Sequence, residues 1–193
     1  MKGYAELLLL LAVGGLPVGA TAAEITLPEL MRTLAQVERA NARFIETRHS
    51  PLLKAPLVLR GTLSYRRPGR LEKHVLSPYD ERIVIDGGQV TIENRTRGWN
   101  KVLSIDAAPG LAGLVESIRA TRAGELQALE RFYVVESGGS REHWWLRLKP
   151  HAPEIAQYVN AVTIKGSGPR IERIETEETS GDQTTMEISE QFE

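Results

Sequence analysis

Apolar and polar residues alternate along much of the chain, which is the pattern of a strand buried on one face only. The clearest case is the segment 57–66, LVLRGTLSYR. Its apolar or small face carries Leu57, Leu59, Gly61, Leu63 and Tyr65. Further segments of strand length span 70–77, 81–86, 89–94, 99–105, 131–137, 142–149, 158–165, 170–178 and 183–190. Turn-forming sequences such as RPGR, SPYD and SGGSR separate them, so we predict a mostly antiparallel sheet.

Two segments have the periodicity of a helix instead. Residues 27–44 predict an amphipathic helix that runs into a strand, with Thr26 as a candidate N-cap. The stretch from Pro109 to Gly124 repeats apolar residues at i, i+3, i+4 and i+7, and these are Leu111, Leu114, Val115 and Ile118. A sheet of about ten strands tends to curl. We therefore predict an α+β, mainly antiparallel fold: a curled, open half-barrel of about ten strands with covering or lid helices and an apolar hollow.

The first residues resemble a targeting segment. Lys2 precedes an apolar run at 7–18, and the small residues Ala20, Ala22 and Ala23 follow it. This pattern predicts a signal peptide over 1–23, cleaved after Ala22 or Ala23, and a soluble product outside the cytoplasm. The remaining residues, 24–193, are of the right length for one domain.

Composition narrows the classes of function. The net charge is -1 with 25% charged residues, which argues against a nucleic-acid partner, because phosphate binding needs a concentrated positive field. The chain has no cysteine, and its four histidines show no metal-binding spacing. No nucleophile elbow or phosphate-binding loop is present in the sequence. We expect no catalysis, no cofactor and no metal.

The segment GTLSYRRPGRLEKHVLSPYDERIVIDGGQVTI carries a family resemblance. It is similar to the LolA family of periplasmic lipoprotein carriers at Gly61, Leu63, Arg67, Pro68, Pro78, Asp86 and Gly87. The resemblance implies a half-open barrel closed by a helical lid, which carries acylated cargo from an inner-membrane donor to an outer-membrane acceptor in the periplasm. It also implies that Arg67 hydrogen-bonds the lid while the cavity is shut. We expect a monomer that contacts acyl chains of a lipoprotein or another lipid.

A latch of this kind has a physical purpose. Burying about fifteen methylenes yields on the order of 12 kcal/mol, so a carrier needs a closed, empty state that competes with its cargo. Arginine has five planar donors with which to stabilise that state. The candidate cavity residues are Leu59, Leu63, Tyr65, Leu71, Leu111, Leu114, Val115, Ile118, Trp144 and Leu146.

Each of these assignments has a plainer alternative. The RPGR sequence also fits an ordinary Pro-Gly turn with solvated arginines. The residues of the helical stripe, and Trp144, more often pack in a core than line a cavity. Where the LolA family favours aromatic residues after the Arg-Pro pair, this chain has Leu71, Glu72 and Lys73, which indicates a different lipid. The rival function is a lipid-sensing or scaffold subunit of a membrane-associated system.

Overall fold

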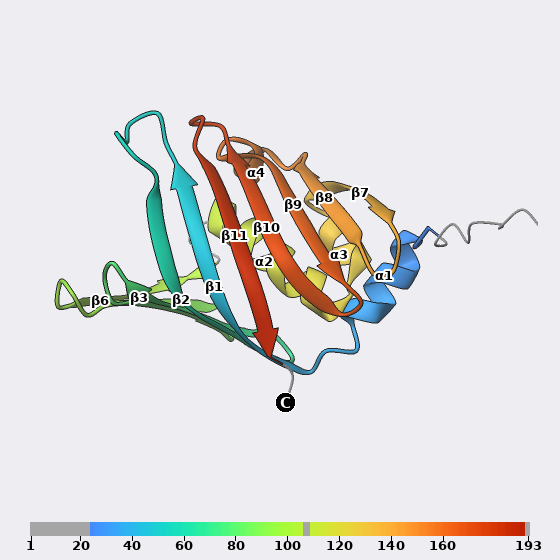
Figure 1. Ribbon diagram of the computed structural model, residues 1–193, viewed down its shortest axis with the longest axis horizontal. Helices are drawn as coiled ribbons and strands as arrows, with labels where there is room; N and C mark the ends of the chain where they lie inside the picture. Colours follow the sequence, from blue (N-terminus) through green and yellow to red (C-terminus); the bar gives the residue numbers. More distant parts are fainter. Residues whose placement is uncertain (1–23, 106–108, 192–193) are drawn as a thin grey trace, which may run out of the picture.

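The computed structural model describes residues 24–105 and 109–191. Within them, eleven strands form one antiparallel sheet in the order β6-β5-β4-β3-β2-β1-β11-β10-β9-β8-β7 (Figure 1). The strands are β1 (Arg39–His49), β2 (Leu57–Arg66), β3 (Arg70–Ser77), β4 (Glu81–Asp86), β5 (Gln89–Asn94), β6 (Trp99–Ser104), β7 (Tyr133–Gly139), β8 (Trp144–Pro150), β9 (Val159–Ser167), β10 (Arg170–Glu178) and β11 (Gln183–Gln191). Because β1 pairs with both β2 and β11, the N-terminal and C-terminal strands meet in the middle of the sheet.

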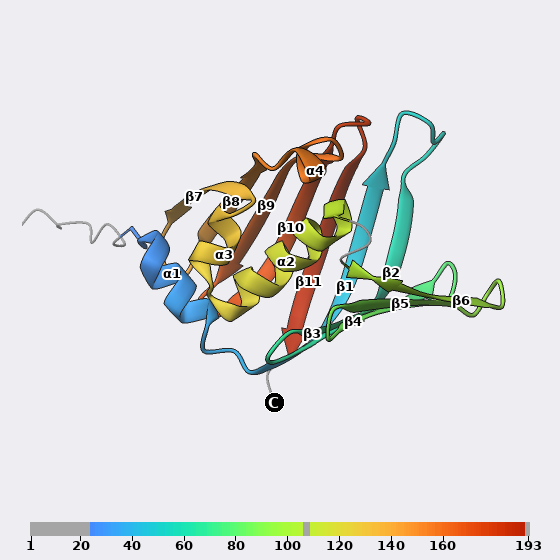
Figure 2. The same ribbon diagram turned by 180° about the vertical axis from the view of Figure 1, so that it is seen from behind.

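The sheet is open, with β6 and β7 as its two edges. Strands β7 to β11 lie face-on in Figures 1 and 2, whereas β3 to β6 are seen nearly edge-on, so the sheet twists strongly beyond β2. The predicted class, α+β and mainly antiparallel with covering helices, is confirmed, but the eleven strands form one open sheet that does not curl into the expected half-barrel. Every predicted strand segment falls on an observed strand.

The helices lie on one face of the sheet, as Figure 2 shows. They are α1 (Leu27–Leu34), α2 (Pro109–Ala123), α3 (Leu126–Glu130) and α4 (Pro153–Ala156). The α1 helix begins as its sequence predicts: the Thr26 N–H donates to Glu29 Oε2 at 3.0 Å, which satisfies a backbone donor that the helix leaves free. The short helices α3 and α4 were not anticipated, because five or four residues are too few to show a helical period.

The hydrophobic core lies between these helices and strands β7 to β11 with β1 and β2. Leu30 and Leu34 of α1 are fully buried there, as are Leu146 and Leu148 of β8. Trp144 is 2% exposed, and its indole N–H donates to the Gly168 carbonyl at 2.8 Å, so its polar atom is satisfied. Burying a leucine or isoleucine side chain contributes about 1.5–3 kcal/mol, and this cluster is therefore the main source of stability.

Candidate ligand-binding cavity

A cavity of about 410 Å³ lies between α2 and the helix-covered face of the sheet. Its walls come from β1 to β4 on one side and from β9 to β11 on the other, and residues 117–122 of α2 cover it. The lining is largely apolar and includes Ala42, Leu63, Leu71, Ile85, Ile164 and Ile188. Such a volume and lining are typical of a site for an apolar or amphipathic ligand.

The sequence of β1 explains why space remains there. Alternate residues of this strand point toward the helices, and they are Ala40, Ala42, Phe44 and Glu46. Alanines at positions 40 and 42 fill little volume, whereas Phe44 packs in the core. The cavity therefore runs along β1 over its small residues.

The structure brings four of the predicted cavity residues together. Leu63 and Tyr65 of β2, Leu71 of β3 and Ile118 of α2 line the cavity. Leu59, Val115, Trp144 and Leu146 are buried and do not line it. For Trp144 this matches the core-packing alternative. The side chains of Leu111 and Leu114 lie outside the described part of the chain.

Arg67 lies in the turn between β2 and β3 and contacts the end of α1. Its guanidinium donates a hydrogen bond to the Ala35 carbonyl, and its backbone N–H donates to the Glu38 carbonyl at 3.0 Å. The last carbonyls of a helix lack intrahelical partners, and a cation is favourable at that end. The family resemblance implies a bond from Arg67 to a helical lid over the cavity, whereas the bond in the structure goes to the end of α1.

The same turn also lies against α2. A Cβ added to Gly69 would come within 3.0 Å of the Arg119 Cδ, so glycine permits this close approach. Arg119 in turn pairs with Glu125, with 2.6 Å between Nη2 and Oε2. The RPGR turn therefore contacts both helices that border this end of the sheet.

One end of the cavity holds a buried ion cluster, which we call the Glu46 cluster: Glu46, Arg48 and Lys73. Glu46 is 1% exposed; its Oε1 accepts from Arg48 Nε at 2.6 Å and its Oε2 accepts from Lys73 Nζ. Burial alone would raise the pKa of Glu46, but the two cations outweigh it and the pKa lies below its ordinary value. Burial lowers the pKa of Lys73, and Glu46 offsets only part of that effect.

The sequence contained a signal for this cluster that our reasoning missed. Glu46 follows Ala40, Ala42 and Phe44 on the inward face of an alternating strand, where a carboxylate needs a partner. Lys73 was noted only as a departure from the family pattern. Its partner could not be named from sequence, since the two residues lie on strands that do not pair directly.

The other end of the cavity holds Tyr65 and Arg122. The Tyr65 hydroxyl is buried and has no hydrogen-bond partner among the described residues. The Arg122 Cζ lies 6.0 Å from the centre of the Tyr65 ring, and Nη1 donates to the Pro169 carbonyl at 3.3 Å. Burial lowers the pKa of Arg122 to about 10, with Tyr65 acting in the opposite direction. Sequence reasoning had placed Tyr65 in the cavity but not Arg122.

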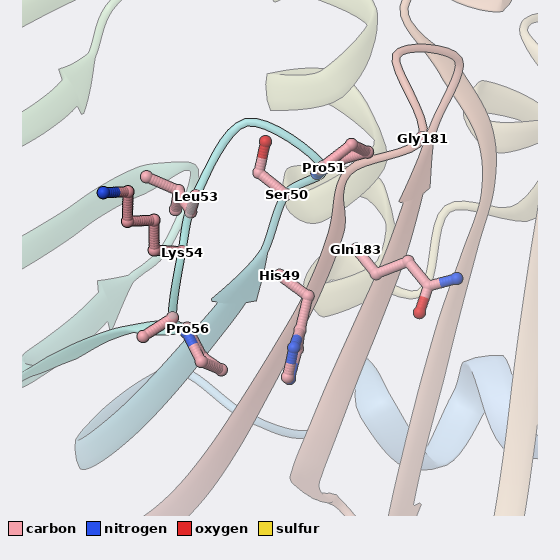
Figure 3. Close-up of a pocket in the computed structure, with 9 residues that line it drawn as sticks. His49, Ser50, Pro51, Leu53, Lys54, Pro56, Gly181 and Gln183 are labelled. Atoms are coloured by element: carbon pink, nitrogen blue, oxygen red, sulfur yellow. The ribbon is translucent and has the colours of Figure 1, made fainter.

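A second, smaller hollow of about 290 Å³ lies outside this site (Figure 3). The loop from β1 to β2 and the turn from β10 to β11 form it, and His49, Pro51, Lys54 and Gln183 are among its lining residues. Across residues 24–105 and 109–191, no group of three or more His, Asp or Glu side chains could hold a metal ion. In the same ranges no helix has the length and apolar character needed to cross a membrane.

Comparisons with known proteins agree with this architecture. Two curated relatives are named outer-membrane lipoprotein carrier protein. The protein of Bordetella bronchiseptica is 27% identical over 186 residues, which covers 92% of this chain and 85% of the relative. The protein of Bordetella pertussis is 28% identical with the same coverage.

Among solved structures, the fold matches a Vibrio parahaemolyticus domain provisionally described as an outer membrane lipoprotein-sorting protein domain. The TM-score is 0.50 at 8% identity, and the match covers 86% of this chain and 91% of that domain. The family model described as outer membrane lipoprotein carrier protein LolA-like matches residues 19–189. The chain therefore belongs to the LolA-like family of outer membrane lipoprotein carrier proteins.

Proposed function

We propose that the protein is a non-catalytic carrier that binds the acyl chains of a lipoprotein or another lipid in the cavity under α2. The observation that carries this proposal is the cavity itself, about 410 Å³ with a largely apolar lining, in a chain of the LolA-like family. The carrier moves its cargo between an inner-membrane donor and an outer-membrane acceptor. The predicted signal peptide supports a periplasmic location.

In this proposal α2 is the lid and Arg67 stabilises the shut state. Ile118 of α2 is 42% exposed although it lines the cavity, so this helix only partly seals the space beneath it. The RPGR turn contacts α1 through Arg67 and α2 through Gly69. Movement of α2 on loading would disturb the second contact, while the Arg67 bond holds the turn against the end of α1, in the position where α2 meets it in the shut state.

A transfer assay tests the proposal. Donor vesicles of phosphatidylethanolamine and phosphatidylglycerol would carry a pyrene-labelled triacyl lipopeptide, and transfer to unlabelled acceptor vesicles would be followed by loss of pyrene excimer emission. We expect the protein to accelerate transfer in proportion to its concentration. Binding without acceleration would contradict the carrier and favour the lipid-sensing alternative, and no binding at all would contradict both.

A matched pair of variants assigns the effect to the cavity. Ala42→Phe adds a ring inside the cavity, whereas Arg43→Phe adds the same ring to the exposed face of the same strand. We expect Ala42→Phe to reduce binding and transfer at least tenfold, because the ring occupies the space of the acyl chain. Arg43→Phe should behave as the wild type. Equal transfer by both variants would place the ligand elsewhere.

A further inference from the structure

The cavity has two polar ends that differ in how their hydrogen bonds are satisfied. Tyr65 opposes Ala40 across the β1–β2 pair, and Glu46 lies six residues further along β1, which is roughly 20 Å in a strand. In the Glu46 cluster both carboxylate oxygens accept from cations within the protein. The Tyr65 hydroxyl has no acceptor or donor among the described residues, although the side chain is only 5% exposed.

An unsatisfied buried hydroxyl is costly. Leaving such a group without a partner destabilises a protein by about 1–3 kcal/mol, and native structures retain few of them. Tyr65 lines the cavity, so a molecule bound there lies against the side chain that carries this hydroxyl. A phenol hydroxyl donates most strongly to a charged oxygen.

The side chains around Tyr65 also favour a negatively charged oxygen as their hydrogen-bond acceptor. Arg122 lines the same end, is 7% exposed and has its guanidinium next to the Tyr65 ring. A guanidinium has five donors in a plane that matches carboxylate and phosphate oxygens. Ser117 and Thr121, one turn apart on α2, also line the cavity, and the Thr121 hydroxyl donates to the Ser117 carbonyl at 2.6 Å. The face of α2 that lines the cavity therefore carries polar groups beside the apolar Ile118, and a purely hydrocarbon ligand does not require them.

Two charged side chains outside the cavity, near its Tyr65 end, are positive, as Arg122 is. Arg39 begins β1 and Arg66 ends β2, and the two are direct partners in the sheet register. For neither does the described part of the chain show an ion pair. Arg66 directly follows Tyr65 in the chain. Both arginines are exposed and alternate with the inward residues Ala40 and Tyr65, so they add positive charge to this end of the strands from the other face of the sheet, and such a field favours an anion.

We propose that the Tyr65–Arg122 end of the cavity binds the acidic head group, a carboxylate or a phosphate, of an acyl ligand whose chain extends along β1 toward the Glu46 cluster. The Tyr65 hydroxyl donates to one oxygen of the head group and the Arg122 guanidinium to another. The ligand thus joins β2 to α2. This inference rests on the proposed function, since it names the class of lipid that the carrier holds.

Three ligands that share a sixteen-carbon hydrocarbon chain and differ in head group test this preference for an acid. Displacement of a fluorescent fatty acid from the purified protein would be measured with hexadecanoic acid, hexadecyl phosphate and hexadecanol, at a pH where both acids are ionised. We expect both acids to bind roughly tenfold or more tightly than the alcohol, which is the gain from a hydrogen bond to a charged group. Equal binding of acid and alcohol would overturn the proposal while leaving the carrier function intact. Failure of all three to bind would instead contradict the proposed function.

Two variants test whether Tyr65 and Arg122 cause the preference for an acidic head group. Tyr65→Phe removes only the hydroxyl and should weaken the two acids about tenfold without weakening hexadecanol. Arg122→Met should do the same, and the retained thermal transition would show that the fold persists. Tyr79→Phe is the matched control, because Tyr79 packs against the core and does not line the cavity. Unchanged acid binding in Tyr65→Phe would overturn the assignment.

Inorganic phosphate separates a lipid head group from a free anion. If the acyl chain supplies most of the affinity, as proposed, phosphate without a chain should displace the fluorescent fatty acid only at concentrations far above those of hexadecyl phosphate. Displacement by phosphate at similar concentrations would mean that the site takes a free anion, and would overturn the assignment to an acyl ligand.

Discussion

The two halves of the sheet are stabilised in different ways. Under the helices, β8 buries Trp144, Leu146 and Leu148 in a core that excludes water. In the other half, every described residue of β4 is intermediate or exposed. Side-chain pairs support it instead: Arg82 donates to both oxygens of Glu72 at 2.8 Å, and Arg70 Nη1 lies 2.5 Å from Asp86 Oδ2. Such pairs at a partly exposed surface contribute little each, so a sheet gains most of its stability where a second layer covers it.

The cavity lies where these two halves meet. Its lining includes Ile164 of the covered half and Ile83 and Ile85 of β4 in the other half. One wall is therefore part of the packed core. The opposite wall belongs to strand β4, which lies outside that core and therefore deforms more easily. A cavity built in this way can admit a ligand without opening the core.

The largest expected difference between the halves is in the free energy of unfolding. Leu146→Ala removes a fully buried side chain and should cost about 2–5 kcal/mol, because a cavity remains in the core. Val102→Ala, on the β6 edge, removes a side chain that is 59% exposed and should cost less than about 0.5 kcal/mol. Urea unfolding measures both, and similar costs would show that the two halves are stabilised alike.

An intermediate effect is expected at the boundary, in the Glu46 cluster. Lys73→Met takes a donor from a carboxylate that is 1% exposed and should destabilise the protein by about 1–3 kcal/mol. The control is Lys101→Met on β6, where the lysine is exposed and a change within about 0.5 kcal/mol is expected. Equal effects of the two lysines would mean that the cluster contributes no more than surface charge.

Acid unfolding provides a second measurement of this cluster. The pKa of Glu46 is lower in the folded protein than in the unfolded chain. Its contribution is therefore complete above the unfolded pKa of about 4.3 and is lost as the pH falls through the folded pKa. Glu46→Gln should flatten the loss of stability in that range, and an unchanged acid profile would rule out a linked carboxylate at this position.

The smallest effect is expected at the RPGR turn. Arg67→Leu removes the bond to the Ala35 carbonyl. Because this bond is exposed to solvent, its loss should lower the free energy of unfolding by only about 1 kcal/mol. Amide hydrogen exchange at the end of α1 should become faster, and transfer of cargo should slow if Arg67 stabilises the shut state. Arg70→Leu, which breaks a pair with Asp86 in the other half, should leave exchange in α1 unchanged. The same exchange rates in both variants would make RPGR an ordinary turn.

Local pattern determined most of the fold before any tertiary information was used. Alternation in 57–66 predicted both faces of β2, and the helical spacing after Pro109 predicted α2 to within one residue of its observed end. These features depend on neighbours along the chain, whose geometry is set by the repeat of a strand or a helix. The resemblance around Arg67 and Pro68 predicted the family, which the match over residues 19–189 shows.

The tertiary structure alone decided which inward residues face a cavity and which form the core. Leu59 and Leu63 share one face of β2, yet Leu59 is fully buried in the core and Leu63 lines the cavity. The difference depends on what packs above each residue, and α2 covers only part of that face. The partner of Arg67 was hidden for the same reason, since Ala35 precedes it by 32 residues and no periodicity links them. Periodicity determines the direction of a side chain, whereas its contacts depend on how distant segments pack together.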